Sequence, residues 1–241
     1  MSFIRPKWAL PNTVQAVSST RTGGFSTGDF ASLNLGMHVS DDPELVQRNR
    51  QHLQQVSNMP SAAIWMNQTH STVVASVDSP SISAIESDAL VTSTPGVVLS
   101  VMTADCLPVL FASKNGQQVA ATHAGWRGLV GGILENTLEC FAQDVTAWIG
   151  PAIGVEAFEV GEEVRQQFVD IEPSDAIAFI QHKPGKFMAD LPLLAKLRLT
   201  RMGCKDVALS NLCTYSNPET FFSYRRQSNT GRQASFIWIT D

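Results

Sequence analysis

Apolar runs separated by short polar links dominate the middle of the chain. The run 97–103 is followed by a second apolar run, 107–113, which leads into Asn115-Gly116. A third run, 118–122, comes directly after this pair. An Asn-Gly pair between two apolar runs is the strongest short-range signal for a β-hairpin. The pattern therefore predicts a hairpin whose two strands are the second and third runs.

The register of this hairpin brings two reactive side chains close together. With the Asn-Gly pair at the centre of the turn, Pro108 faces His123 and Cys106 faces Gly125. Cross-strand partners share a face of the sheet, as do residues two apart on one strand. Cys106 and His123 are then diagonal neighbours about 7–8 Å apart at the backbone, so a thiolate and an imidazole can meet at one atom. Because proline lacks an N–H, Pro108 marks the beginning or an edge of the strand, and Cys106 precedes the paired region.

The remaining apolar patterns alternate between strand and helix spacing. Strand-like runs are found at 13–19, 63–66, 72–77, 145–149, 206–209 and 234–239. Helix-like runs are found at 43–58, 130–143, 162–169 and 191–202. The first helix has a typical start, with Asp42 as its N-cap and Pro43 at the first helical position. Strands and helices interleave without a repeat or linker, so we expect one α/β (α+β) domain over residues 1–241, and the hairpin implies a mixed sheet.

Composition and charge argue against several classes of function. The 241 residues are 44% hydrophobic and 16% charged, with a formal net charge of −5, which is typical of a globular protein. A negative net charge without a basic cluster argues against a nucleic-acid partner. No apolar stretch approaches the length of about 18 residues that a membrane span needs, and the N-terminus lacks a secretory signal, so a cytoplasmic location is expected. The four cysteines contain no CxxC pair and are expected to be free thiols.

Two loops contain further candidate side chains. His70 lies in the link between two strand-like runs, where functional side chains are often found, although a histidine judged alone is more often a hydrogen-bonded structural residue than a ligand. The Gly-rich loop 20–26 contains Arg21 and can present backbone N–H groups to an anion. It lacks the Lys-Ser/Thr ending of a P-loop, so a plain turn is the alternative.

Several segments together resemble the YfiH-like family, also called the laccase-domain or multicopper polyphenol oxidoreductase-like family. They are SSTRTGGFS, SLNLGMHVSDDPE, QTHS, SDALVTSTPG, TADCLPVL, THAGWRGL, GPAIG, FEVG and CTYSNPETFFSYRR…GRQASFIW, and they run in the family's order from residue 18 to 238. The resemblance implies a single-domain α/β sandwich related to bacterial cysteine-dependent hydrolases. It also implies a metal site formed by His70, Cys106 and His123.

The same resemblance implies an enzyme of purine nucleoside chemistry. Its expected reactions are phosphorolysis of adenosine, inosine and S-methyl-5′-thioadenosine to the base and the (methylthio)ribose 1-phosphate, together with deamination of adenosine to inosine. The expected partners are a purine nucleoside and phosphate, with no membrane and no nucleic acid. A monomer or a homodimer is expected.

The chemistry of the candidate residues is compatible with this activity. One cysteine and two histidines with a fourth position open are the composition of a catalytic zinc site, and Cu²⁺ is an alternative occupant. Asp105 is a candidate base or orienting group for this site, and it can equally cap a turn. Phosphorolysis also needs cations that hold phosphate against the sugar. The candidates for this role are Arg21, Arg127, Arg225 and Arg226.

Other functions remain open from the sequence alone. In a metal-free hydrolase or amidase acting on a cell-wall (UDP-muramoyl) precursor, Cys106 would be the nucleophile and His123 its base. A copper-binding oxidoreductase would use the same three ligands, because His₂Cys with a weak methionine is a blue-copper composition. A multicopper laccase also needs many histidines for a trinuclear centre. The chain has five histidines in total, which are too few for both copper centres, so laccase catalysis by that mechanism is excluded. The remaining alternative is a metal-binding regulatory module without turnover.

Overall fold

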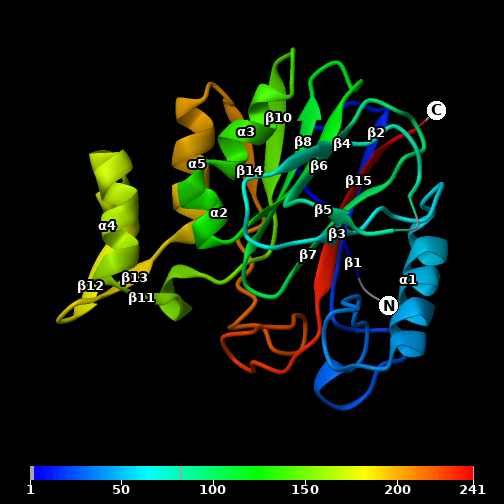
Figure 1. Ribbon diagram of the computed structural model, residues 1–241, viewed down its shortest axis with the longest axis horizontal. Helices are drawn as coiled ribbons and strands as arrows, with labels where there is room; N and C mark the ends of the chain where they lie inside the picture. Colours follow the sequence, from blue (N-terminus) through cyan, green and yellow to red (C-terminus); the bar gives the residue numbers. More distant parts are fainter. Residues whose placement is uncertain (1–2, 82, 241) are drawn as a thin grey trace.

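The computed structural model describes residues 3–81 and 83–240 (Figure 1). Its helices are α1 (Pro43–Ser57), α2 (Trp126–Gly131), α3 (Ile133–Glu139), α4 (Glu162–Ile171) and α5 (Leu191–Arg201). Its strands are β1 (Phe3–Ile4), β2 (Val14–Ser19), β3 (Met66–Asn67), β4 (Val74–Ser76), β5 (Ile85–Glu86), β6 (Ala89–Thr92), β7 (Leu99–Thr103), β8 (Leu107–Ser113), β9 (Val119–Ala124), β10 (Val145–Ile149), β11 (Glu159–Gly161), β12 (Phe179–Lys183), β13 (Lys186–Ala189), β14 (Asp206–Leu209) and β15 (Gln233–Ile239).

Two larger sheets form the centre of the molecule. One has the strand order β14-β10-β8-β9-β6-β4, and the other has the order β1-β2-β15-β7. In the six-stranded sheet β10 pairs with β14, and β4 with β6, in parallel, while the other neighbours are antiparallel. The predicted mixed sheet is therefore confirmed. Helices α2, α3 and α5 cover the outer face of the six-stranded sheet, and α1 lies on the far side of the four-stranded sheet (Figure 1).

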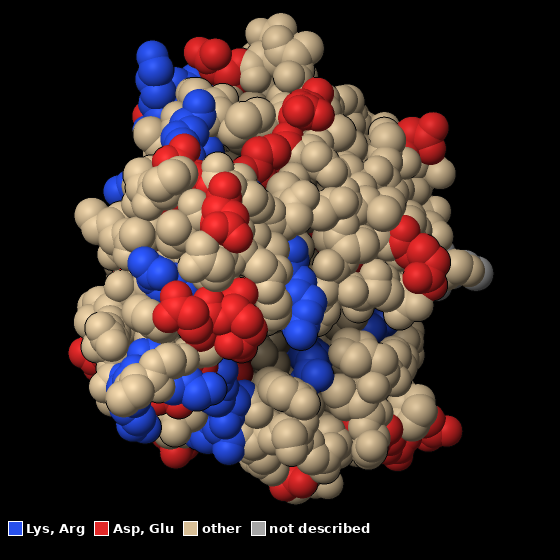
Figure 2. Space-filling view, turned by 60° about the vertical axis from the view of Figure 1, so that its left-hand side comes forward, with Lys and Arg blue, Asp and Glu red and all other residues tan. Residues whose placement is uncertain are grey.

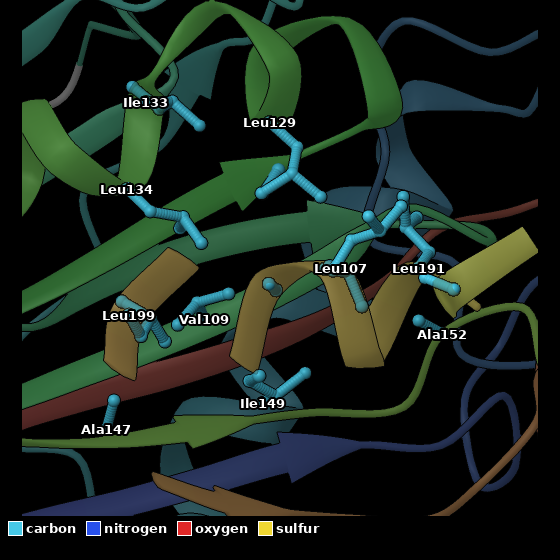
Figure 3. Packing of buried hydrophobic residues seen from close by; sticks show 14 of the residues in the cluster. Leu107, Val109, Leu129, Ile133, Leu134, Ala147, Ile149, Ala152, Leu191 and Leu199 are labelled. Carbon is cyan, nitrogen blue, oxygen red and sulfur yellow. The ribbon is translucent and has the colours of Figure 1, made fainter. Parts of the chain in front are cut away.

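Apolar side chains fill both faces of the six-stranded sheet. Strand β8 illustrates this, because Val109 and Phe111 join the cluster beneath the helices, whereas Leu110 joins the cluster between the two sheets. Figure 3 shows Leu129 of α2 and Leu134 of α3 in the first cluster, above the strands. A strand that is buried on both faces reads as a continuous apolar run, which explains why residues 107–113 show no alternation.

The central hairpin has the predicted register. Pro108 pairs with His123 and Leu107 with Ala124, and Cys106 lies just before the first paired residue. The turn is longer than predicted, because Ser113 donates its N–H to the carbonyl of Gln118 and four residues lie between these two. The two additional turn residues are placed symmetrically about the Asn-Gly pair, so the longer turn leaves the register unchanged.

Most of the other predicted elements agree with the structure. The runs 145–149 and 206–209 coincide with β10 and β14, and 162–169 and 191–202 correspond to α4 and α5. The runs 63–66 and 72–77 are represented only by the short strands β3 and β4. In α1 the Asp42 side chain caps the first turn by accepting the N–H of Glu44.

The single helix predicted over 130–143 is wrong. The chain instead forms α2 and α3, which are separated at Gly132. Gly132 has φ of 98°, a left-handed conformation that ends one helix and starts the next.

Among the helices of residues 3–81 and 83–240, none is both long and apolar enough to cross a bilayer. The face in Figure 2 shows acidic and basic side chains interspersed, without a continuous basic surface.

The packing between the sheets predicts a large difference between two isoleucine substitutions. Ile237 is fully buried between the sheets, whereas Ile177 is 73% exposed. Ile237→Ala should lower the free energy of unfolding by about 2–5 kcal/mol, because it removes buried methyl groups and leaves a cavity. Ile177→Ala should change it by less than about 0.5 kcal/mol. Urea unfolding of both variants measures the difference, and equal losses would contradict the assignment of this core.

Candidate metal centre

The cysteine lies where the chain crosses from one sheet to the other. Strand β7 belongs to the four-stranded sheet and β8 to the six-stranded sheet, and residues 104–106 connect them. Asp105 has φ of 97°, so the connection turns sharply before Cys106. A positive φ at a non-glycine residue is strained, and such positions cluster at functional sites.

Three donor side chains converge at this crossing. His123 comes from β9, Cys106 from the crossing itself and His70 from the loop between β3 and β4. Their ligand atoms all lie within 4.8 Å of one another, and Sγ of Cys106 is 3.7 Å from Nε2 of His70. A Cβ at Gly125 would lie 2.5 Å from Cδ2 of His70, so glycine is required there for this approach.

Asp88, which the sequence analysis did not select, holds both histidines. Its carboxylate is fully buried and accepts the Nδ1–H of His123 at 2.7 Å. The same carboxylate accepts backbone N–H groups from Thr69, His70 and Ser71, and the hydroxyl of Ser71. Asp88 directly precedes the buried strand β6, and a carboxylate at the entry to a buried strand is the sequence signal for such a residue. Because Asp88 occupies Nδ1, the Nε2 atom of His123 is left for the site.

The electrostatics of the cluster favour a thiolate at Cys106. Burial raises the pKa of Cys106, but the charge of His123 and hydrogen bonds from His123 and His70 outweigh it and lower the pKa to about 6. Burial lowers the pKa of His123, and the thiolate together with Asp88 raises it to about 9. The thiolate is the form of cysteine that binds metals and attacks electrophiles.

The donor set is one that both zinc and copper accept, and one of its separations can be compared with zinc geometry. Zn–S and Zn–N bonds of about 2.3 and 2.0 Å in a tetrahedron place sulfur and nitrogen about 3.5 Å apart. The observed separation of 3.7 Å between Cys106 and His70 agrees with this value. Three protein ligands leave a fourth position open, as in catalytic zinc sites. Within residues 3–81 and 83–240 this is also the only cluster of three or more such donors.

The cluster forms part of the wall of a pocket of about 570 Å³. This volume lies within the range of about 300–1,000 Å³ that is typical of small-molecule sites. Three aromatic side chains, Trp126, Phe158 and Tyr224, line the same pocket. A larger hollow of about 710 Å³ lies near the turn of the central hairpin and contains none of the three donors.

Asp105 lines the same pocket as the donors, and its carboxylate is bound by the C-terminal loop. Its carboxylate accepts hydrogen bonds from the hydroxyls of Thr214 and Ser223 and from the backbone N–H of Arg225. Asp105 thus fastens the C-terminal loop to the cysteine crossing, and its role as a base or orienting group stays a prediction.

The four candidate arginines divide into two pairs. Arg127 and Arg225 line the pocket, the first over the ring of Trp126 and the second near Phe158. Arg21 and Arg226 do not line it. The guanidinium of Arg21 donates to the carbonyls of Ala31 and Pro218, and that of Arg226 donates to three other backbone carbonyls. The sequence analysis also missed Arg232 as a pocket residue.

The fold and the site together define an α/β protein with an open His–Cys–His donor set beneath a pocket. The chain belongs to the family described as multi-copper polyphenol oxidoreductase laccase, which matches residues 15–240. The resemblance seen in the sequence is thereby confirmed.

Individual relatives match over nearly the whole chain. The Escherichia coli (strain K12) protein named purine nucleoside phosphorylase YfiH is 48% identical over 240 residues, which are 98% of each chain. The Pseudomonas aeruginosa protein named purine nucleoside phosphorylase PA4543 is 44% identical over 100% of this chain and 99% of its own. The crystal structure of Neisseria meningitidis protein NMB0706 has a TM-score of 0.94 at 44% identity and covers 100% of both chains. The Geobacillus stearothermophilus YlmD structure has a TM-score of 0.88 at 31% identity, covering 95% of this chain and 93% of its own.

The contacts of Asp88 predict its effect on metal binding. Asp88→Asn keeps the side-chain shape but removes the charge and replaces one acceptor oxygen by a donor, so some N–H groups lose their partner. We expect zinc affinity to fall about 10- to 100-fold, the usual loss for an outer partner of a ligating histidine. Competition with a chromogenic zinc chelator measures it.

Asp78→Asn, at an exposed aspartate, is the matched control and should retain the wild-type affinity. A folded Asp88→Asn protein with unchanged zinc affinity would show that Asp88 does not orient the ligands.

Proposed function

We propose that the protein is a cytoplasmic, zinc-dependent purine nucleoside enzyme. It phosphorolyses adenosine, inosine and S-methyl-5′-thioadenosine and deaminates adenosine to inosine. The observation that carries this proposal is the open donor set of His70, Cys106 and His123 beneath a pocket of nucleoside-compatible size. Full-length relatives named purine nucleoside phosphorylase support the choice of substrate.

The residues of the site have separate tasks in this proposal. His70, Cys106 and His123 hold the zinc, and Asp88 keeps His123 in the tautomer that leaves Nε2 free. When bound, zinc supplies Lewis acidity and makes water available as a nucleophile near neutral pH. The aromatic walls of the pocket provide flat apolar surfaces for a purine ring.

Phosphorolysis exchanges one bond at the sugar for another. An oxygen of hydrogen phosphate forms a bond to C1′ of the ribose, and the bond from C1′ to the purine nitrogen breaks. The electrons of the broken bond go to the purine, which takes the proton that the phosphate brings. The products are the free base and ribose 1-phosphate. The protein's task is to hold the phosphate against C1′, and Arg127 and Arg225 are the candidate arginines that line the pocket.

Deamination uses water in place of phosphate. Water adds to C6 of adenosine, ammonia leaves, and inosine results. The pattern HxE…PCxxC of cytidine-deaminase-type enzymes is absent from the chain, so this reaction would use a different arrangement of residues.

A Cys–His hydrolase or amidase acting on a cell-wall precursor is the second candidate. The low pKa of Cys106 beside His123 favours it, because a thiolate–imidazolium pair is the nucleophile of such enzymes. It would also agree with a relationship to bacterial cysteine-dependent hydrolases. The position of His70 argues for metal, since a thiol hydrolase needs only one imidazole. A copper-binding oxidoreductase would use the same three donors.

Metal content and inosine phosphorolysis in three proteins separate these candidates. The wild type should contain about one zinc per chain and release hypoxanthine only when phosphate is present. Cys106→Ala and His70→Ala should both lose zinc and lower the rate by more than about 100-fold, beyond the effect of outer partners of a metal site. Adenosine incubated without phosphate should give inosine.

Matched controls remove general effects of the substitutions. Cys140→Ala and His182→Ala change an exposed cysteine and an exposed histidine and should keep full activity. Full phosphorolysis by a metal-free wild type would refute the zinc-dependent proposal. Loss of activity in Cys106→Ala but not in His70→Ala would support the hydrolase.

A further inference from the structure

The fold places Arg232 next to the cysteine crossing. Arg232 directly precedes β15, and Gln233 at the start of that strand is opposite Thr103 at the end of β7. One step further along the two antiparallel strands, Arg232 comes to the level of residue 104. Its side chain lines the same pocket as the three donor residues.

The side chain of Arg232 is fixed before any ligand arrives. Its Nη1 donates to the carbonyls of Thr230 and Gly231 at 2.9 and 3.0 Å, and its backbone N–H donates to Oδ1 of Asn34. Its stem packs against Gly36, where a Cβ would lie 2.8 Å from Cγ of Arg232. A fixed donor group binds with a smaller loss of conformational freedom than a mobile one.

Within the described part of the chain, Arg232 has no carboxylate partner. Among residues 3–81 and 83–240, no carboxylate lies within ion-pair distance of it, whereas the buried Arg198 pairs with Glu135. Asp105 is nearby, but its carboxylate is occupied by Thr214, Ser223 and the N–H of Arg225. Burial lowers the pKa of Arg232, which reflects the unfavourable removal of this cation from water. An anion entering the pocket would offset that desolvation.

The other pocket arginines are less suited to this role. Arg225 is exposed, although its Nη1, like that of Arg232, donates to two carbonyls, those of Ala157 and Glu159. Arg127 is exposed and lies over the ring of Trp126. Arg232 is half-buried, so a charge-assisted hydrogen bond to it is less screened by water.

His38 adds an uncharged donor near Arg232. It lines the same pocket, and burial together with the charges of Arg232 and Arg50 lowers its pKa. His38 is therefore neutral at pH 7 and offers one ring N–H. The loop that carries it is held by Arg50, whose guanidinium donates to the carbonyl of Leu35.

We propose that Arg232, assisted by His38, is the subsite that binds the phosphate co-substrate beside the metal centre. The assignment of the anion as co-substrate rests on the proposed phosphorolysis. In that reaction the guanidinium holds the non-reacting oxygens of hydrogen phosphate while a further oxygen attacks C1′. Arg127 and Arg225, the two sequence-inferred arginines that line the pocket, then serve its exposed rim.

The test compares phosphate and nucleoside kinetics in one variant series. Arg232→Met should raise KM for phosphate about 10- to 100-fold, as expected for loss of a charged hydrogen-bond partner. KM for inosine should change by less than about threefold, because the base and sugar contacts are retained. Arg232→Lys keeps the positive charge but lacks the planar guanidinium. Its KM for phosphate should lie between those of the wild type and Arg232→Met. Arg48→Met, at an exposed arginine on α1, is the matched control and should behave as wild type.

Calorimetric titration of the same proteins with inorganic phosphate separates this proposal from the proposed function. Phosphate binding that weakens in Arg232→Met and partly recovers in Arg232→Lys supports the subsite, even if the wild type releases no base and the phosphorylase proposal fails. Wild-type phosphate affinity and KM in folded Arg232→Lys and Arg232→Met proteins would overturn the subsite, even if phosphorolysis is observed. Thermal unfolding establishes whether each variant is folded. If Arg232→Met does not fold, the phosphate affinity of Arg232→Lys decides the test.

Discussion

The buried carboxylate of Asp88 is the interaction on which the site depends. It connects two segments that are far apart in sequence, because it accepts N–H groups from residues 69–71 and the ring N–H of His123. Burial opposes its ionisation, yet the hydrogen bonds from His123 and Ser71 hold the pKa of Asp88 well below its usual range. A charge buried in this way is stable only when its hydrogen-bonding capacity is met. The carboxylate therefore fixes the positions of two donors at once.

A second carboxylate organises the other side of the pocket in the same manner. Asp105 accepts hydrogen bonds from the hydroxyls of Thr214 and Ser223 and from the backbone N–H of Arg225, so the C-terminal loop is joined to the cysteine crossing. Both His70 and Asp105 have positive φ. Strained conformations persist where surrounding contacts determine them, and here each strained residue lies in a network centred on an aspartate. The geometry of the donors is thus built into the fold.

Local patterns in the sequence were sufficient for the hairpin but not for the long-range pairing. The Asn-Gly pair and the two apolar runs determined the register that places Pro108 opposite His123, because these signals act between neighbours in sequence. Arg232 was missed because its position depends on β15 pairing between β2 and β7, which no local pattern encodes. Arg21 was selected for its Gly-rich loop, yet its donors are used by backbone carbonyls. Asp88 was missed for a related reason, since its partners come from other strands and loops.

The position of His70 bears on the choice between a metal centre and a thiol nucleophile. A nucleophilic cysteine needs one base, and His123 with its aspartate already provides a complete Cys–His–Asp arrangement. The chain nevertheless adopts a left-handed conformation at His70 and keeps position 125 without a side chain, which together bring a second imidazole to 3.7 Å from the sulfur. In a hydrolase the second imidazole would add only a further hydrogen bond and charge beside the sulfur. For a three-donor metal site the second imidazole is required, so the local geometry favours metal binding as the purpose of the cluster.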